Sequence, residues 1–323
     1  MSARRDVLFH LVLACAGLGL AAWATAEPDA ARSDAGQVEV FDCGAATEVV
    51  FESAQRDVTL RRGGEGIWIE VVRRPREGEP VRRRFRGGEE AEGYLASVSP
   101  LDARRALGRL EGTALADVGL DGEPEATLAI ACGDERHRFA VGGRAYGTGD
   151  RYVRAEDGRV YLLPARRLRD LDVAELRLMQ HRLHRFPEAA AAAATVRAGE
   201  RSWRLLHRNR RSAQAAWVAA ERPEERRRDL ARLMRALWQL AVSEYLEAPP
   251  GELGEPVLEA RWEGVGGEAL GEVTLRRAGE GPSTRYLVRS EVTGGWAEVL
   301  PSAGAAVARA LDALRGEDPD GER

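Results

Sequence analysis

Residues 119–171 constrain the fold more than any other stretch, because short apolar runs alternate there with strong turn signals. The dipeptide Asp157-Gly158 is typical of a two-residue hairpin turn, and it separates runs rich in valine, tyrosine and leucine. Upstream, residues 133–136 separate two further runs of strand-like composition, 126–131 and 138–141. Strands joined by tight turns pair antiparallel, so this stretch predicts a meandering antiparallel sheet.

The residues on either side predict a further hairpin and several helices. Before the stretch we expect a glycine-separated hairpin and two helices, with bounds 58–72, 89–97 and 100–110. The second helix has a clear start signal, because Ser99 precedes a proline at the first helical position. After the stretch, a helix is predicted to begin near Arg166, and its apolar pattern continues to Phe186.

The order of these elements recurs after an alanine run at residues 189–194. Residues 285–289 (Arg-Tyr-Leu-Val-Arg) resemble residues 151–154 (Arg-Tyr-Val-Arg), and Leu300-Pro301 resembles Leu163-Pro164 at nearly the same offset. Two interpretations fit this pattern: an internal duplication, or one larger α+β domain. We favour the duplication, because four elements recur in the same order.

We therefore predict an α+β protein of two tandem related units after an N-terminal hydrophobic helix. Each unit is expected to be a twisted, mostly antiparallel sheet with helices packed on one face. The predicted parts are a signal peptide or membrane anchor at 1–26, a spacer at 27–37, a first α+β unit at 38–186, an Ala-rich linker at 187–194, a second α+β unit at 195–315 and a polar tail at 316–323.

The N-terminal segment predicts export. Arg4 and Arg5 precede an apolar run over residues 7–26, which is long enough to cross a bilayer of about 30 Å as a helix. The positive flank should stay in the cytoplasm, so the remainder is expected on the periplasmic side of the inner membrane. Ala24-Thr25-Ala26 fits a signal-peptidase site, with cleavage after Ala26. An uncleaved anchor and a soluble periplasmic protein released by cleavage both remain open.

Export would place the two cysteines outside that segment, Cys43 and Cys132, in a compartment that permits disulfides. A bridge between them would close a loop of about 90 residues and stabilise the fold by about 4 kcal/mol. The alternative is a pair of buried free thiols, because sequence alone does not show whether the two Cα atoms lie within reach.

Composition excludes some classes of partner. The chain has no lysine, so its 48 basic residues are all arginine, and 52 acids give a net charge of −4. The arginines are spread along the chain, whereas a nucleic-acid-binding protein usually carries a net basic surface. We therefore expect no nucleic-acid partner.

Few residues are candidates for metal binding, phosphate binding or acid–base catalysis, and each candidate is weak. His181 and His184 are three residues apart and would share a helix face as metal ligands, but a zinc site needs three or four ligands. The glycine-rich run 142–149 lacks the lysine of a phosphate loop. The acid pairs Glu89-Glu90 and Asp170/Asp172 arise readily in so acidic a chain. We predict no enzyme activity, no catalytic residue and no cofactor.

Five tryptophans fall mostly at strand positions, where packing in the core is the ordinary role. One or two of them are alternative candidates for a ligand- or partner-binding face. They are Trp68, Trp203, Trp217, Trp262 and Trp296.

The layout of the first half resembles the bacterial family of domain of unknown function 4340. The resemblance covers residues 38–186 and, more loosely, the remainder, and it departs at the arginine-rich residues 73–86 and at the alanine run. Its features are Val58-Thr59-Leu60 followed by Trp68, Gly119-Leu120-Asp121 with Pro124, Val141-Gly142, Tyr152-Val153, and Val160-Tyr161-Leu162-Leu163 before a helix. The resemblance implies a membrane-anchored envelope protein, often encoded beside ABC-transporter components of the gliding-motility type, and implies no active site.

These observations predict a membrane-tethered, non-catalytic accessory or scaffold protein of the cell envelope. Its expected partners are proteins of the inner membrane, including ABC transporter subunits. Two alternatives remain: a module that binds an envelope ligand or polymer in a cleft between the units, and a metal-dependent hydrolase that uses His181 and His184.

Overall fold

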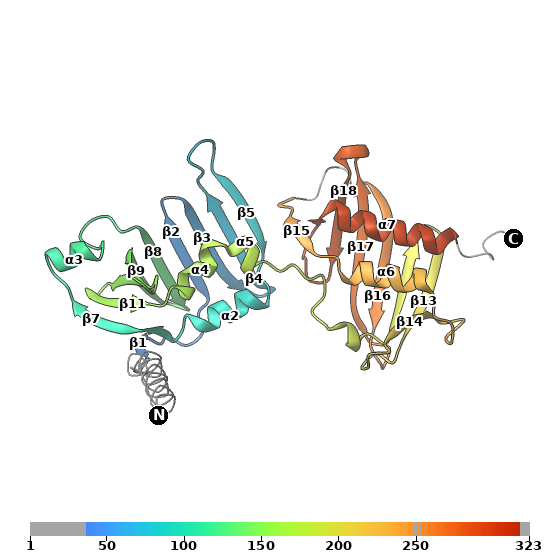
Figure 1. Cartoon of the computed structure of the whole chain (residues 1–323), viewed down its shortest axis with the longest axis horizontal. Helices are drawn as coiled ribbons and strands as arrows, with labels where there is room; N and C mark the ends of the chain where they lie inside the picture. The colour runs from blue at the N-terminus through green and yellow to red at the C-terminus, as the bar shows by residue number, and fades with distance from the viewer. Residues whose placement is uncertain (1–36, 249–250, 252, 317–323) are drawn as a thin grey trace, which may run out of the picture.

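The computed structural model describes residues 37–248, 251 and 253–316 of the 323-residue chain. Its architecture is α+β, as the sequence predicts, and strands in both large sheets pair antiparallel with their neighbours. Figure 1 shows one large sheet built from the first half of the chain and the other from the second half, next to each other along the long axis.

The first large sheet has nine strands, most of them joined in sequence by tight turns. The predicted hairpin is present, but residues 156–158 form its loop, so the turn is one residue longer than the predicted two-residue turn. The Gly158 N–H donates to the Ala155 carbonyl oxygen at 2.9 Å, and Gly158 has φ of 83°, a conformation that favours glycine. In spatial order the strands are β5 (Val81–Arg86), β4 (Gly66–Arg73), β3 (Arg56–Gly63), β2 (Glu48–Ser53), β8 (Ala126–Cys132), β9 (Glu135–Arg144), β10 (Arg151–Ala155), β11 (Arg159–Leu163) and β7 (Arg105–Arg109).

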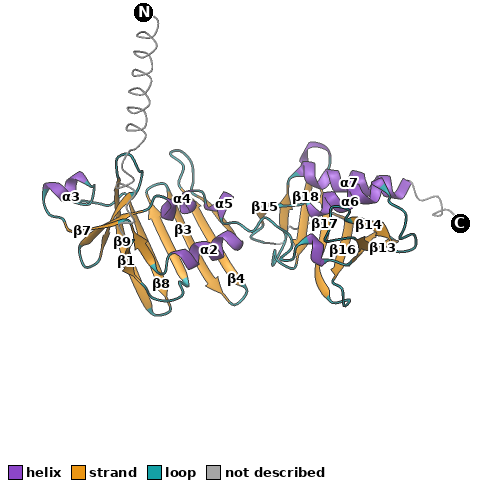
Figure 2. Cartoon of the chain, turned by 60° about the horizontal axis from the view of Figure 1, so that its bottom comes forward, coloured by secondary structure: helices purple, strands orange, loops and turns teal. Residues whose placement is uncertain are grey.

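Helices cover one face of this sheet. The helices α2 (Glu89–Ser97), α4 (Arg166–Asp172) and α5 (Ala174–Arg177) lie over it in both views (Figures 1 and 2), and α3 (Thr113–Asp117) lies at its far end. Successive side chains of a strand point to opposite faces. On β4, Ile67 and Ile69 are therefore buried on the core side, whereas Trp68 between them lies on the face that these helices leave open.

Residues 101–109 form strands, so the helix predicted over 100–110 is wrong. The strand β6 (Leu101–Ala103) pairs with β1 (Val38–Phe41) in a two-stranded sheet, and β7 pairs with β11. Gly108 has φ of 74° inside β7, a conformation outside the helical region. Pairing with two distant strands outweighs a local start signal, because that signal contributes only about 1 kcal/mol.

The second large sheet has eight strands and carries two helices on one face. In spatial order its strands are β14 (Ala216–Ala219), β13 (Arg201–Arg208), β12 (Ala193–Ala198), β16 (Glu255–Glu263), β17 (Ala269–Ala278), β18 (Arg285–Ser290), β19 (Ala297–Val299) and β15 (Val242–Tyr245). Helices α6 (Arg228–Trp238) and α7 (Pro301–Gly316) pack against each other over this sheet (Figure 2). Two short 3-10 helices are η2 (Glu188–Ala190) and η3 (Gly281–Ser283).

A glycine lets α7 lie close to the sheet. A Cβ at Gly304 would lie 2.1 Å from the Cγ atom of Tyr286 on β18, so no larger residue fits there without a shift. The buried residues Val307, Leu311 and Leu314 continue the same side of α7 and pack into the core.

The two large sheets share one strand order. When β5 is set aside, the remaining eight strands of the first sheet run β4-β3-β2-β8-β9-β10-β11-β7, and those of the second run β14-β13-β12-β16-β17-β18-β19-β15. Numbered along the chain within each sheet, both orders read 3-2-1-5-6-7-8-4. In both halves one helix (α2, α6) falls between the third and fourth of these strands, and another (α4, α7) follows the eighth. The additional strand β5 comes from the arginine-rich residues 73–86.

The connection between the sheets differs from the prediction. In place of the helix predicted from Arg166 to Phe186, the structure has the two short helices α4 and α5, separated at Val173, and residues 178–187 run without a helix. The alanine run is not a free linker, because Ala193 and Ala194 already belong to β12 and Ala191 is buried. The predicted signal or anchor, its cleavage site after Ala26, most of the spacer and most of the tail lie outside the described residues. Among the described helices, none combines the length and apolar character needed to cross a membrane.

Candidate binding clefts where the two sheets meet

The segment that follows α5 pairs with the first sheet. Met179 forms an antiparallel bridge with Gly87, just after β5. The Gln180 N–H donates to the Arg86 carbonyl oxygen at 2.8 Å, and the Gly88 N–H donates to the Leu178 carbonyl oxygen at 2.9 Å. The segment therefore satisfies backbone groups at the end of the edge strand β5.

The next residues of the same segment pair with the second sheet. Arg182 bridges Ala241, and the Val242 N–H at the start of β15 donates to the His181 carbonyl oxygen at 2.9 Å. The Tyr245 hydroxyl donates to the Gln180 carbonyl oxygen at 2.9 Å. We call residues 178–182 the junction strand, because its hydrogen bonds join the edges of both sheets. In Figure 1 the chain after α5 runs from the first sheet, where β5 is labelled, toward the second sheet, where β15 is labelled.

A large cleft opens beside the junction strand on the side of the helices. Its volume is about 780 Å³, and it reaches from Ile67 on the core side of β4, past Glu89 at the start of α2, to Val292 of the second half. We call it the helix-side cleft. Its lining balances four arginines with four glutamates: Arg86, Arg177, Arg182 and Arg185, and Glu65, Glu89, Glu90 and Glu92.

Arg86 occupies the wall between the helix-side cleft and the open face. It is 7% exposed, and its Nη1 donates to the Glu65 carbonyl oxygen at 2.8 Å. Its guanidinium carbon lies 4.6 Å from the ring centroid of Trp68, a cation–π contact. A Cβ at Gly294 would lie 3.1 Å from its Nη2, so the second half of the chain closes over this side chain.

A second, smaller cleft lies on the open face, and we call it the open-face cleft. Its volume is about 390 Å³. The first sheet contributes Trp68 and Arg84, and the second half contributes Tyr245, Arg289 and Trp296. The Arg84 guanidinium carbon also lies 4.6 Å from the Trp68 ring centroid. Burial raises the pKa of the Tyr245 phenol, and nearby Arg86 acts in the opposite direction.

His181 and His184, the weak metal candidates, do not share a helix face. They lie in and just after the junction strand rather than on a helix, so their spacing does not place them on one face. His181 Nδ1 lies 2.9 Å from the Val242 carbonyl oxygen, and His184 Nδ1 lies 2.9 Å from Glu291 Oε1. Among the described residues no cluster of three or more metal-ligating side chains is found.

His184 instead belongs to an aromatic cluster beneath α6. Its ring stacks on Trp238 at 5.2 Å between centroids and meets Trp262 edge-on at 4.3 Å, and Phe186 lies 4.9 Å away. With only 8% of its surface exposed, His184 packs as a core residue whose ring is oriented by Glu291.

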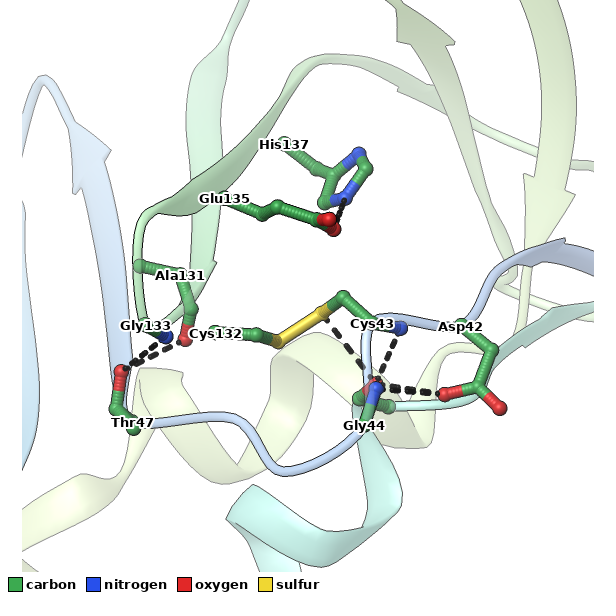
Figure 3. The surroundings of a disulfide bond; sticks show 10 residues. Asp42, Cys43, Gly44, Thr47, Ala131, Cys132, Gly133, Glu135 and His137 are labelled. Carbon is green, nitrogen blue, oxygen red and sulfur yellow. Dashed lines mark hydrogen bonds and ion pairs between the residues drawn. A yellow bond between two sulfur atoms is a disulfide. The ribbon is translucent and has the colours of Figure 1, made fainter.

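Cys43 and Cys132 are joined in a disulfide, with their Cα atoms 5.9 Å apart. The bond links the segment between β1 and β2 to the end of β8 (Figure 3). Near it, Thr47 Oγ1 donates to the Ala131 carbonyl oxygen at 3.1 Å, and Ser99 Oγ accepts from the Cys43 N–H at 3.1 Å. The bridge is thus a structural crosslink close to the N-terminal edge of the folded part.

The other candidates from the sequence are the glycine run, the acid pairs and the tryptophans, and each has a definite place in the fold. Gly142 and Gly143 lie within β9, near its end, where a Cβ on Gly142 would lie 2.4 Å from the Val118 carbonyl oxygen. Glu89 and Glu90 start α2 and line the helix-side cleft, whereas Asp170 and Asp172 belong to α4. Trp217 and Trp262 are core residues, while Trp68, Trp203 and Trp296 are half-buried.

No local sequence pattern singles out the arginines of the clefts. A usable signal exists in residues 81–86, where alternate arginines of one strand face the same side as Trp68. Recognising it requires the knowledge that this run is a strand paired with β4.

Comparisons with known proteins give no further identification. The chain matches no family model, no curated protein and no solved structure. The resemblance to the family of domain of unknown function 4340 stays a prediction.

Proposed function

We propose that this chain is an exported, membrane-tethered, non-catalytic accessory or scaffold protein of the cell envelope, positioned on the periplasmic side of the inner membrane. The proposal adds that it works with protein partners in that membrane, namely subunits of an ABC-type transport complex. The choice of partner rests on the family resemblance alone. The role as a scaffold rests on the junction between the sheets.

The observation that carries the scaffold role is the junction strand. Its backbone groups bond to β5 on one side and to β15 on the other, and Arg83 of β5 forms an ion pair with Glu244 of β15 at 3.7 Å. Two sheets held in this way present one continuous surface with a large cleft in it. A fixed, extended surface of this kind suits a protein that holds partners in place.

We further propose that the two halves are tandem related units that arose by duplication. The shared strand order 3-2-1-5-6-7-8-4 and the matching positions of the helices support this, because such an order is one of many that eight strands allow. In this interpretation β5 is an addition to the first unit, and it supplies the edge that meets the junction strand.

Export and tethering are supported by two features. The positively flanked apolar run of residues 7–26 has the composition of an anchor or a signal peptide. The Cys43–Cys132 disulfide suits an oxidising compartment and secures the chain soon after the spacer.

The test is purification of the full-length chain from detergent-solubilised membranes, with bound proteins identified by mass spectrometry. We expect ABC permease and ATPase subunits in a stable ratio. Arg182→Glu combined with Arg185→Glu, two exposed residues at the helix-side cleft, should reduce this recovery. The matched control is Arg138→Glu with Arg197→Glu, exposed residues of β9 and β12 away from the junction. A soluble, partnerless protein that begins at Glu27 would contradict the proposal.

An envelope ligand- or polymer-binding module is the second candidate function, and the two clefts favour it. Binding of the protein to isolated cell-wall material, with no transport subunits recovered from membranes, would replace the first proposal with this one. The metal-dependent hydrolase has no supporting geometry, because no cluster of three or more metal-ligating side chains is found among the described residues.

A further inference from the structure

We propose that the open-face cleft binds a small anion whose ring has an apolar C–H face, which is the chemistry of an acidic sugar. The site combines unpaired guanidinium groups with indole rings in a hollow of about 390 Å³. That volume lies in the range of small-molecule sites, about 300–1,000 Å³. This inference stands independently of the transport partner.

The cations of the cleft are available to a ligand. Arg84 and Arg289 are exposed, and within the part of the chain that the structure describes neither forms an ion pair or a hydrogen bond. Neighbouring arginines differ in this respect, since Arg82 pairs with Glu70 at 3.1 Å and Arg83 with Glu244 at 3.7 Å. A guanidinium presents several N–H donors in a planar fork that fits a carboxylate or a phosphate.

The charge of the lining selects an anion. Of the described residues that line the open-face cleft, two are arginines and Glu247 is the one acid, and buried Arg86 lies directly behind Trp68. The helix-side cleft has a lining of four arginines and four glutamates, so it offers no such preference. The open-face cleft is therefore the better candidate for an anionic ligand, although it is the smaller of the two.

The two tryptophans that line the open-face cleft favour a ligand with a ring. Trp68 from β4 and Trp296 from the residues before β19 are both half-buried, and they approach the cleft from opposite sheets. An indole combines a large apolar face with a polar N–H, and for this reason it suits ligands that are apolar on one face and polar at the rim. The Arg84 and Arg86 guanidinium groups lie over the Trp68 ring, so Trp296 offers the indole face to the ligand and Trp68 holds Arg84 at the cleft. At Gly295 a Cβ would meet nothing within 4 Å, which leaves this part of the rim open.

The test is isothermal titration of the purified full-length protein with three probes that share a six-membered ring: glucuronate, glucose 6-phosphate and glucose. The first two separate a carboxylate from a phosphate source of the anion, and glucose is the neutral control. We expect at least one anionic sugar to bind about tenfold or more tightly than glucose, as a charge-assisted hydrogen bond provides. Inorganic phosphate, which lacks the ring, should bind more weakly than the better sugar.

Variants locate the site. Arg84→Gln and Arg289→Gln should each weaken binding of the better probe about tenfold, and Trp68→Leu or Trp296→Leu about threefold or more. The matched control Arg138→Gln, on the open face of β9 but outside the cleft, should bind as the unchanged protein does. In ¹⁵N spectra, the indole signals of Trp68 and Trp296 should shift on titration while that of buried Trp217 stays in place.

Four results would overturn the inference. They are equal binding of glucose and the anionic sugars, inorganic phosphate binding as tightly as the better sugar, unchanged affinity in both arginine variants, and no binding of any probe at about 10 mM, a concentration that detects even weak sites.

Discussion

The hydroxyl of Tyr245 in β15 donates a hydrogen bond to the carbonyl oxygen of Gln180 in the junction strand, with 2.9 Å between the oxygens. Tyr245 is 9% exposed, so this bond is largely shielded from water. We predict that Tyr245→Phe lowers the free energy of unfolding by about 1 kcal/mol, because the ring still packs but the partly buried Gln180 carbonyl oxygen loses a donor. Thermal denaturation should show the midpoint falling by about 2 °C.

The control for this substitution is Tyr146→Phe. Tyr146 is fully exposed in the turn after β9, and its replacement should leave the midpoint unchanged. If the two variants melt at the same temperature, the bond between β15 and the junction strand does not stabilise the fold.

The close approach of the junction strand to α2 gives a second prediction. A Cβ at Gly88 would lie 2.7 Å from Gln180 Oε1 and 3.2 Å from Gln180 Cα, so Gly88→Ala must move the Gln180 side chain aside and shift its backbone slightly. The Gln180 side chain would also lose its hydrogen bond to the Arg182 carbonyl oxygen, now 2.7 Å. We expect a loss of about 1–2 kcal/mol in denaturant unfolding, the range for moderate overpacking.

Gly93→Ala is the matched control, because the same change is made within α2, the helix that Gly88 precedes. A Cβ at Gly93 would meet nothing within 4 Å, so this variant should be more stable by about 0.5–1 kcal/mol through the helix preference of alanine. The prediction fails if Gly88→Ala is as stable as Gly93→Ala.

Local signals in the sequence were sufficient for the antiparallel hairpins. Gly158 and Gly66 have positive φ in their turns, a conformation that few other residues adopt, and the strands on either side follow. The same local reasoning failed for residues 100–110. There the helix start signal at Ser99 competes with pairing to β1 and β11, whose partners lie about 50 or more residues away in the chain.

Local sequence signals could not predict the candidate site. The open-face cleft brings together Trp68 and Arg84 with Tyr245, Arg289 and Trp296, and no spacing within a single element relates these two groups. For His181 and His184, a local spacing pointed to a site that the fold does not form. Its spacing suggested a shared helix face, yet the segment is extended because its backbone pairs with β15, and His184 packs against Trp262.

The disulfide gives a third prediction. The Cys43→Ser/Cys132→Ser variant should lose about 4 kcal/mol of unfolding free energy, because the bond closes a loop between residues 89 positions apart. Guanidinium denaturation without reductant measures the loss. Dithiothreitol should lower the stability of the unchanged protein toward that of the variant and leave the variant itself unaffected. Equal thiol titration of the unfolded, unchanged protein with and without prior reduction would show that the bond is absent.

The last prediction concerns acid stability through Asp229 in the first turn of α6. Asp229 is 3% exposed, and burial alone would raise its pKa. Hydrogen bonds from the Arg227 guanidinium, with 2.5 Å between Nη2 and Oδ2, and from the Leu230 N–H outweigh burial and hold the pKa of this carboxyl below its usual range. The carboxylate also lies at the positive end of the helix dipole.

A carboxyl whose pKa is lower in the folded state stabilises the protein at pH values above its unfolded pKa of about 3.9, and this contribution disappears as the pH falls through the folded value. Asp229→Asn should therefore cost about 1–2 kcal/mol at pH 7, and the difference from the unchanged protein should shrink below about pH 4. Exposed Asp134→Asn in the turn before β9 is the control and should show no such difference. A cost that stays constant from pH 7 to pH 3 would mean that Asp229 acts through packing rather than through its charge.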